Sequence, residues 1–448
     1  MSLCFLCLLL FLDDDRSHPV RKFSSLERMQ LVHLAAAHAD AARIQATRRK
    51  VPPLTRLQDF RGILHAHAED STHTGGTRNE MLADAHKADV SIILLTNHHR
   101  PPTDFITDNW NGLHEGVLFL PGSEARGLLI YPTQSVMQYM EKPLPEFLDI
   151  IRRDRGLAFL SHIEERPGHS MEGLDGLEIY NRHADAKRDP AGLVGLLVRM
   201  TDPSELRALE EGLARFPDEM LASQNDYPDD YLAKWDRETA TRRLTGVAAN
   251  DCHHNQILLM KMVDANTVKI GTNVDSDDKF RPFSSLLRPK IRELVKDRKP
   301  GDVIARLDFD PYYRSFRNSS THIFASELSE SAVRLALREG HAYVSHDWMC
   351  DPTGFRFVLC QGPSAPDTPT AILGDEVPLA ESQNLVAEFP TSCLIRLLKD
   401  GRPIETRRSE RLEWPVREAG VYRLEGWLAI DGEDRPWIYS NPIYVRQP

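Results

Sequence analysis

The chain has 448 residues, with 55 Lys and Arg against 66 Asp and Glu, so its formal net charge is −11. A composition that is 41% hydrophobic and 27% charged excludes a disordered protein, and the length predicts more than one domain. The acidic balance argues against long nucleic acid as a partner and favours a small-molecule substrate.

The first 55 residues are expected to form a leader and an N-terminal extension. An apolar run from Cys4 to Leu12 has the length of a secretory signal core, but no Lys or Arg precedes it and three aspartates follow it. An atypical export signal and a true start at Met29 both fit this pattern, and we favour a cytoplasmic protein over an exported one. No other segment is apolar enough to span a membrane.

Residues 56–350 are expected to form an α/β domain, because short apolar runs alternate with helix-like stretches between residues 61 and 255. The expected strands are Gly62–His65, Ser91–Thr96, Val117–Pro121, Leu157–Ser161, Leu177–Tyr180 and Leu244–Ala249. The expected helices begin with a capping box at Thr77-Arg78-Asn79-Glu80 and continue with Glu146–Arg155, Asp202–Leu221 and Asp229–Arg243. This order predicts a closed α/β barrel or a doubly wound sheet.

The alternation stops after His254, and from about residue 255 a charged connector follows, with one clear helix at Glu330–Glu339 that ends at Gly340. Residues 351–448 change to strand-like runs with turn signals at Asp400-Gly401 and Asp431-Gly432. The expected strands are Phe355–Leu359, Leu385–Phe389, Leu394–Leu398, Val421–Leu428 and Trp437–Val445. We therefore expect an all-β, sandwich-like domain at the C-terminus.

Histidines and carboxylates follow the ends of the expected α/β strands. In chain order they are His65, His67, His73, His98, His99, Glu124, His162, Asp251, His253 and His254. The carboxyl ends of barrel strands meet at one mouth, so these side chains are expected to converge there. Neutral imidazole and carboxylate are the ligands of zinc, manganese and iron(II), and the pattern predicts a metal site.

Other polar residues near these strands are given structural roles. Asp70 is expected to hold a loop, and Cys252 is expected to pack in the core rather than bind metal. The histidines that follow no strand are expected on the surface or in loops; they are His86, His114, His169, His183, His322 and His341.

The strand-end motifs resemble those of the PHP (polymerase and histidinol phosphatase) family of metal-dependent hydrolases. HAHAEDSTH from His65 to His73, LLTNHH, SHIEERPG and NDCHH occur in the order of that family. The resemblance implies a distorted (β/α)7 TIM-like barrel with two or three divalent metal ions (Zn, Mn or Fe) at its mouth. The Glu178–Asn181 stretch, the helix before Gly340 and the β-rich tail together resemble the carbaryl-hydrolase branch of the family.

The resemblance also implies a ligand set. His65, His67, Glu124 and Asp251 would hold one metal ion, and His73, His98 and His253 would hold another. Glu124 would bridge to a third ion completed by His162. The chain departs from the family at two places, because Gly127-Leu128-Leu129 stands where a further histidine is usual and Asn97 stands where aspartate is usual. The third metal ion therefore stays open.

The function that these observations predict is hydrolysis of a small phosphoester or related ester by a metal-bound hydroxide. Glu124, Asp251 and His253 are the expected catalytic residues, and His99 or His254 are alternatives to Asp251 for moving the proton. Arg100, Arg126 and Arg166 follow ligand-bearing segments and are expected to bind an anionic group of the substrate.

Three alternatives to a phosphoesterase stay open. The first is a carbamate or carboxylic ester hydrolase of the carbaryl-hydrolase type. The second is a catalytically weak, metal-containing binding protein whose C-terminal region recognises a partner. The third is the amidohydrolase family, which also begins with His-x-His on a barrel strand, although the extra His73 and the closing Asp251-x-His253 argue against it.

Overall fold

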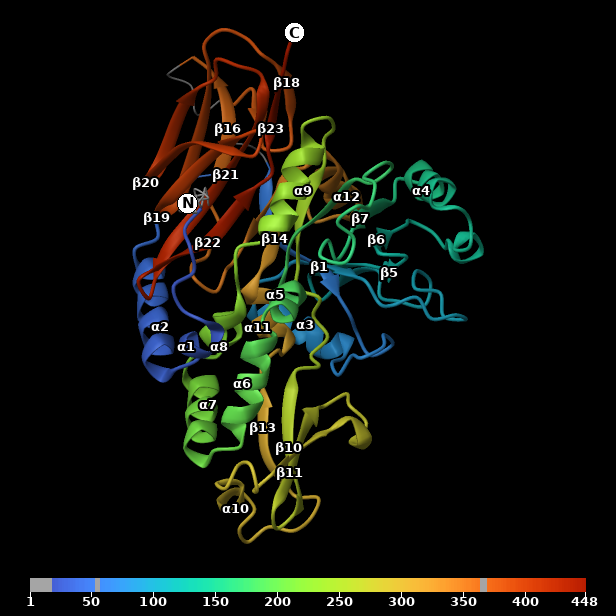
Figure 1. Cartoon of the computed structure of the whole chain (residues 1–448). Coiled ribbons are helices and arrows are strands. Elements are labelled where there is room, and N and C mark those ends of the chain that lie inside the picture. The colour runs from blue at the N-terminus through green and yellow to red at the C-terminus, as the bar shows by residue number, and fades with distance from the viewer. Residues whose placement is uncertain (1–17, 53–56, 363–368) are drawn as a thin grey trace, which may run out of the picture.

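The computed structural model describes residues 18–52, 57–362 and 369–448 (Figure 1). The apolar run Cys4–Leu12 lies outside these residues. Within them, no helix combines the length and the apolar character needed to cross a membrane. The molecule is mixed α/β, with the C-terminal strands at one end and a small antiparallel sheet at the opposite end (Figure 1).

The N-terminal extension packs on the folded chain. It forms helices α1 (Ser25–Arg28) and α2 (Leu31–Ala46). Ser24 and Glu27 make a capping box at the start of α1. The buried guanidinium of Arg28 pairs with Glu433, near the other end of the chain, at 2.9 Å.

The first expected strands form one edge of a large sheet. β1 (Gln58–Ala66), β2 (Ile92–Leu95) and β4 (Val117–Leu120) run parallel, and β3 (Gly112–His114) pairs antiparallel with β4. Helix α3 (Arg78–Lys87) joins β1 to β2, and its predicted capping box between Thr77 and Glu80 is confirmed.

The next strands form a separate five-stranded sheet. Its order is β5 (Ser123–Ala125), β6 (Leu128–Tyr131), β7 (Leu157–Leu160), β8 (Gly176–Asn181) and β9 (Thr245–Ala249). The connecting helices are η1 (Met137–Tyr139), α4 (Leu144–Arg153), α5 (Arg182–Arg188), α6 (Pro190–Met200), α7 (Pro203–Arg215), α8 (Pro217–Leu221), η2 (Ala222–Gln224) and α9 (Asp229–Thr239). The single helix predicted over Asp202–Leu221 is divided at Phe216, because Pro217 lacks the N–H that would continue it and starts a new helix instead.

The predicted TIM-like barrel is not confirmed by the sheet topology. The two sheets meet through an isolated parallel bridge between Ala66 and Cys252 and a hydrogen bond from the Glu124 N–H to the Thr96 carbonyl at 2.9 Å. Between β5 and β6 the chain turns back in a tight antiparallel hairpin rather than crossing over through a helix. Arg126 and Gly127, with φ of +58° and +79°, form that turn.

The charged connector is folded. Residues 257–308 form an antiparallel sheet from β10 (Ile257–Asp264), β11 (Thr267–Thr272), β12 (Arg281–Ser284) and β13 (Val303–Asp308), with η3 (Asp277–Lys279) and α10 (Ile291–Leu294) between strands. The chain then returns to β1 through α11 (Tyr312–Asn318), β14 (Ser320–Ala325), α12 (Glu330–Glu339) and β15 (Ala342–Ser345). The predicted helix Glu330–Glu339 is confirmed, and Gly340 ends it at φ +76°.

The C-terminal region is rich in strands, as predicted. It contains β16 (Arg356–Gln361), β17 (Ala371–Ile372), β18 (Glu376–Pro378), β19 (Gln383–Lys399), β20 (Arg402–Pro415), β21 (Gly420–Ile430), β22 (Glu433–Ser440) and β23 (Ile443–Arg446). β22 pairs with β15, with Ser440 opposite Tyr343, so the C-terminal strands and β1 belong to one 14-stranded sheet. Backbone pairing thus crosses residue 350, where we predicted a domain limit; that limit stays a prediction.

Candidate metal centre

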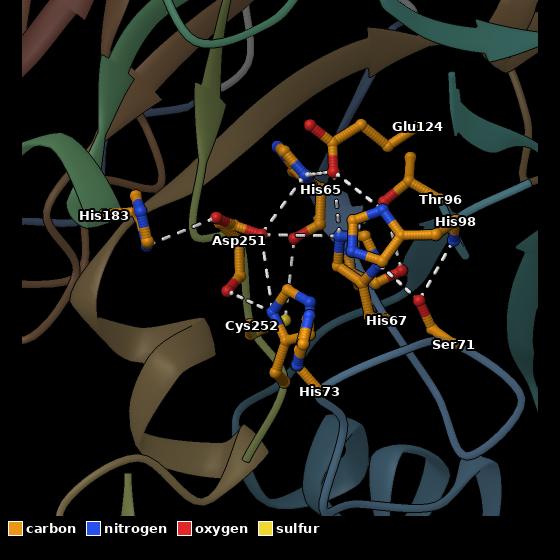
Figure 2. Close-up of polar contacts among 12 residues, drawn as sticks. His65, His67, Ser71, His73, Thr96, His98, Glu124, His183, Asp251 and Cys252 are labelled. Carbon is orange, nitrogen blue, oxygen red and sulfur yellow. Dashed lines mark hydrogen bonds and ion pairs between the residues drawn. The ribbon is translucent and has the colours of Figure 1, made fainter. Parts of the chain in front are cut away.

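Side chains from the strand ends of both sheets converge in one cluster (Figure 2). His65 ends β1 and His67 follows it, while Glu124 lies in β5. Asp251 and His253 follow β9, which meets β1 at the bridge between the sheets. The convergence that the sequence predicted is therefore present, although the strands do not form one closed barrel.

Two sets of ligand atoms lie close enough together to hold a cation. The first set is His65, His67, Glu124 and Asp251, and the second is His67, His98 and His253. Within each set the candidate ligand atoms all lie within 4.8 Å of one another. His67 belongs to both sets, and its ring stacks on that of His253 with 3.9 Å between centroids.

Three buried atoms in the first set have no hydrogen-bond partner among the described residues: His65 Nε2, His67 Nε2 and Asp251 Oδ1. The two nitrogens lie 3.3 Å and 3.4 Å from that oxygen. Leaving buried polar atoms without partners costs free energy, and a shared divalent cation would satisfy all three at once. These residues therefore fit a metal ion.

The opposite nitrogen of several rings is already held by a hydrogen bond. The Nδ1 contacts are His65 with Glu178 at 2.8 Å, His67 with Ser71 at 3.1 Å and His162 with Glu164 at 3.2 Å. Metal-binding histidines typically use such partners to fix the ring orientation and the tautomer. The Nε2 atoms of these three rings are consequently left to face the cluster.

Glu124 faces histidines with both of its carboxylate oxygens. Oε2 lies 3.4 Å from His65 Nε2 and 3.3 Å from His98 Nδ1. Oε1 lies 3.1 Å from His162 Nε2. This placement suits the bridging role that the resemblance implies, and the role itself stays a prediction.

The environment of the cluster shifts the pKa values of its imidazoles in opposite directions. Burial lowers the pKa of His65, but Asp251 and Glu124 outweigh burial and raise it to about 10. Burial and the neighbouring His253 hold the pKa of His67 well below its usual value. His67 is therefore neutral at neutral pH, which is the form of imidazole that binds metal.

Two cluster residues have strained backbones. His162 has a φ of +48° and Asp251 a φ of +50°, in the left-handed region that favours glycine. Such a conformation costs on the order of 1 kcal/mol or more for each residue and persists where surrounding contacts enforce it, as at functional sites. In these conformations His162 Nε2 lies 3.1 Å from Glu124 Oε1, and Asp251 Oδ1 lies 3.3 Å from His65 Nε2.

Two predicted ligands, His73 and His162, belong to neither set. His73 is exposed and has a φ of +59°. Its carbonyl accepts a hydrogen bond from Asn255 Nδ2 at 2.9 Å. His67 stands in the second set where His73 was expected. His162 contacts Glu124 and Asp251 without belonging to either set.

The three predicted substrate-binding arginines contact backbone carbonyls. Arg126 donates to the carbonyls of Met140 and Lys142, at 3.2 Å and 2.8 Å. Arg100 donates weakly to the Asp70 carbonyl, and Arg166 to that of Ser161. Their role in binding an anion stays a prediction.

The predicted surface or loop position is wrong for His322, while His183 is half-exposed and makes a contact that was not predicted. His183, in the first turn of α5, puts Nδ1 3.6 Å from Asp251 Oδ2 (Figure 2). His322 in β14 is 1% exposed and lies between Asp59 and Asp347. Neither is next to another site residue in the sequence, so only the tertiary contacts reveal these roles.

No role at the metal site was predicted for Glu178, although it is fully buried and contacts His65. A carboxylate between apolar residues in a buried strand is a signal that would have found it. Tyr312 was predicted to lie in an aromatic patch between domains; its hydroxyl donates to the His67 carbonyl at 2.5 Å. Cys252 packs in the core and Asp70 pairs with Arg78 at 2.6 Å, as their structural roles predicted.

The alternative proton carriers lie apart from the ligand sets. His254 Nε2 lies 3.3 Å from Asp308, and the ring of His99 packs edge-on against Phe105. Asn97, where aspartate was expected, accepts a hydrogen bond from the Ala68 N–H and donates one to Asp70. Its neutral amide thus holds the loop after β1 rather than a ligand.

The missing histidine after Glu124 has a local cause. Gly127, the first of the three residues at that place, has a φ of +79°, and the side chain of Arg166 fills the space that a Cβ on Gly127 would need. A histidine at this position would meet both obstacles.

Comparisons with known proteins give little for this chain. No family model matches it, and no curated protein matches it. Among solved structures, it is similar to a two-domain protein from Bacteroides vulgatus described as containing a predicted PHP-like metal-dependent phosphoesterase, at 12% identity and a TM-score of 0.36. The alignment covers 88% of this chain and 98% of that chain. At this identity and TM-score, the similarity supports no conclusion about the function of this chain.

Proposed function

We propose that this protein is a metal-dependent hydrolase of small esters, with phosphoesters as the first choice. The observation that carries the proposal is the set of three buried, unpartnered ligand atoms on His65, His67 and Asp251. The hydrogen bonds on the opposite ring nitrogens of the two histidines support it, because they aim these atoms inwards.

The residues divide into two ligand sets for divalent ions, which we propose to be Zn, Mn or Fe. His65, His67, Glu124 and Asp251 would hold one ion. His98 and His253 would hold a second, with His67 rather than His73 beside them. Bound ions of this kind lower the pKa of water and polarise the scissile bond.

In the proposed reaction a water oxygen bonds to phosphorus, the P–O bond to the leaving group breaks, and an alcohol and a phosphate are released. Glu124 and Asp251 would help to hold the divalent ions beside the scissile bond, and His253 packs beside His67. The water proton needs a path to the leaving oxygen. Asp251 Oδ2 lies 3.6 Å from Nδ1 of the half-buried His183, which can pass a proton onwards.

Hydrolysis of a carbamate or carboxylic ester is the second candidate. It is favoured by the contacts of Arg100, Arg126 and Arg166, whose guanidinium groups bond to backbone carbonyls. A phosphate ester would benefit from a free guanidinium at the cluster more than an uncharged ester would. The two ligand sets suit hydrolysis of a P–O bond and of a C–O bond equally well.

The test is a p-nitrophenyl panel of phosphate monoester, phosphate diester, acetate and carbamate, with protein reconstituted with Mn²⁺ or Zn²⁺. His67→Ala, which removes the residue common to both ligand sets, should lose turnover and at least one equivalent of bound metal by elemental analysis. The matched control is His86→Ala, since His86 is exposed on α3 and should change neither.

Turnover of phosphoesters alone would support the first proposal, and preference for acetate or carbamate would support the second. Metal binding without turnover of any ester would overturn both and favour a metal-containing binding protein. Equal metal content in the wild type and His67→Ala would remove the cluster as the metal site.

A further inference from the structure

A largely apolar cavity of ≈ 340 Å³ lies beside the metal cluster. Its walls come from α5, α6, α8, β10 and the residue after β13; the apolar lining residues include Leu193, Leu196, Met220, Leu221, Leu258 and Phe309. Small-molecule sites typically occupy about 300–1,000 Å³ and are mostly apolar with few polar groups. The cavity therefore has the size and chemistry of a binding site.

His183 connects this cavity to the cluster. It lines the cavity, and its Nδ1 lies 3.6 Å from Asp251 Oδ2 (Figure 2). A second apolar cavity of similar volume, between residues 51–59 and β16, has no cluster residue in its lining. Of these two apolar cavities, the one at α5 is placed to receive a group attached to a bond that reacts at the cluster.

A buried polar side chain also points to a ligand in this cavity. Arg182 lines it, is 4% exposed, and donates through Nη2 to Gln256 Oε1 at 2.7 Å. Its Nε is buried without a hydrogen-bond partner among the described residues. A buried donor of this kind is costly unless another molecule supplies the acceptor.

We propose that the cavity is a subsite for the apolar part of the ester substrate, an alkyl or aryl leaving group next to the scissile bond. One acceptor atom carried by that group, such as an ether oxygen, would satisfy the buried Nε of Arg182. The inference rests on the proposed function and names its substrate class: esters of apolar alcohols rather than of sugars or other polar alcohols.

The test separates binding from turnover. Methyl-, butyl- and hexylphosphonate, whose P–C bond is not hydrolysed, are titrated into the Mn²⁺-loaded full chain by calorimetry. We expect affinity to rise about two- to fourfold for each added methylene, since burial of one is worth about 0.8 kcal/mol. The value of kcat/KM for the corresponding alkyl phosphates should rise in parallel.

Leu196→Trp fills the cavity from α6. It should abolish the rise with alkyl length both in phosphonate affinity and in kcat/KM. The matched control is Val194→Trp on the same helix, because Val194 is 61% exposed and does not line the cavity. If Leu196→Trp does not fold, Leu193→Glu at the half-exposed rim should also reduce the gain per methylene.

If the wild type binds the three phosphonates with equal affinity, the subsite is overturned. Ester turnover by the same protein would then leave the proposed function standing. A rising series that Leu196→Trp does not change would also overturn it. A rising series that Leu196→Trp abolishes, without turnover of any ester, would support the subsite and overturn the proposed function.

Discussion

At the scale of single residues, Glu178 controls the orientation of a candidate ligand. It is fully buried in β8, and Oε1 lies 2.8 Å from His65 Nδ1. Its other oxygen accepts hydrogen bonds from the His162 N–H and from Asn181 Nδ2, both at 2.9 Å. One carboxylate thus fixes the ring of His65 and the strained backbone of His162 together.

Glu178→Gln should weaken metal binding about 10- to 100-fold, the usual cost of losing a partner of a ligating histidine. The amide removes the negative charge, and its NH₂ group cannot accept the hydrogen bonds that Oε2 accepts. Competition with a fluorescent chelator would measure the affinity. Glu172→Gln, at an exposed position just before β8, is the matched control. Equal affinities for the two variants would contradict the role of Glu178.

At the scale of elements, His322 joins β14 to its neighbours. Its Nδ1 lies 2.8 Å from Asp59 Oδ1 of β1, and its Nε2 lies 3.4 Å from Asp347, which follows β15. Burial lowers the pKa of His322, but the two carboxylates raise it overall to about 9. The imidazole is therefore charged at neutral pH and balances two buried carboxylates.

The stability that His322 supplies should depend on pH. Its pKa in the folded chain lies above the ordinary value of 6.5, so the contribution is complete below pH 6.5 and is lost as pH rises through about 9. We expect His322→Gln to lower the free energy of unfolding by on the order of 1–3 kcal/mol at pH 6 and by clearly less at pH 9.5. Urea unfolding at both values would measure this.

The matched control for His322→Gln is His86→Gln, since His86 is an exposed histidine on α3. It should change the free energy of unfolding little at either pH. A loss in His322→Gln that is the same at pH 6 and pH 9.5 would show that packing, rather than charge, gives His322 its effect.

At the scale of the whole molecule, the N-terminal extension is bound to the C-terminal strands. Arg28 donates to both oxygens of Glu433, at 2.9 Å and 3.1 Å. The same carboxylate accepts the N–H groups of Lys22 and Phe23 and faces Arg435 at 3.0 Å. Burial raises the pKa of Glu433, but Arg28 and Arg435 lower it overall to about 2.

Arg28→Met should lower the free energy of unfolding by about 3 kcal/mol, the lower end for breaking a buried ion pair, because Arg435 still faces Glu433. Arg43→Met is the control, since Arg43 forms an exposed pair with Asp40 within α2 and should cost under about 1 kcal/mol. Equilibrium unfolding in urea would compare them. Equal losses would exclude a special role for Arg28.

A chain that begins at Met29 would lack Arg28 and the capping box of α1, so it should lose at least as much stability as Arg28→Met. Export or retention in the cytoplasm is a separate prediction, because it depends on residues outside the described part of the chain.

The sequence predicted much of the fold because strand-forming and helix-forming signals are local. Each of the six apolar runs from residue 61 to residue 249 is a strand, and their order along the chain is as expected. Elsewhere the local signal misled. Pro390 and the polar Thr391 divided β19 into two predicted strands, whereas the structure passes through them with a register shift between Glu388 and Cys393.

The charged connector and β20 lacked a recognisable strand pattern for a physical reason. Every residue of β20 except Leu412 is exposed or partly exposed, and among the described residues its one strand partner is β19. Strands of this kind are stabilised by pairing with a neighbour rather than by their own apolar residues. A pattern of hydrophobicity along one segment does not record such pairing.

By itself, the sequence determined that histidines and carboxylates lie at the ends of successive strands, and so it predicted a metal site. Only the tertiary structure decided that His67 replaces His73 in the second ligand set, that Glu178 holds His65 from 113 residues away, and that His183 reaches Asp251. It also divided the expected barrel into two sheets. The physical reason is that strand and helix signals act between near neighbours, whereas ligand geometry depends on how distant segments pack.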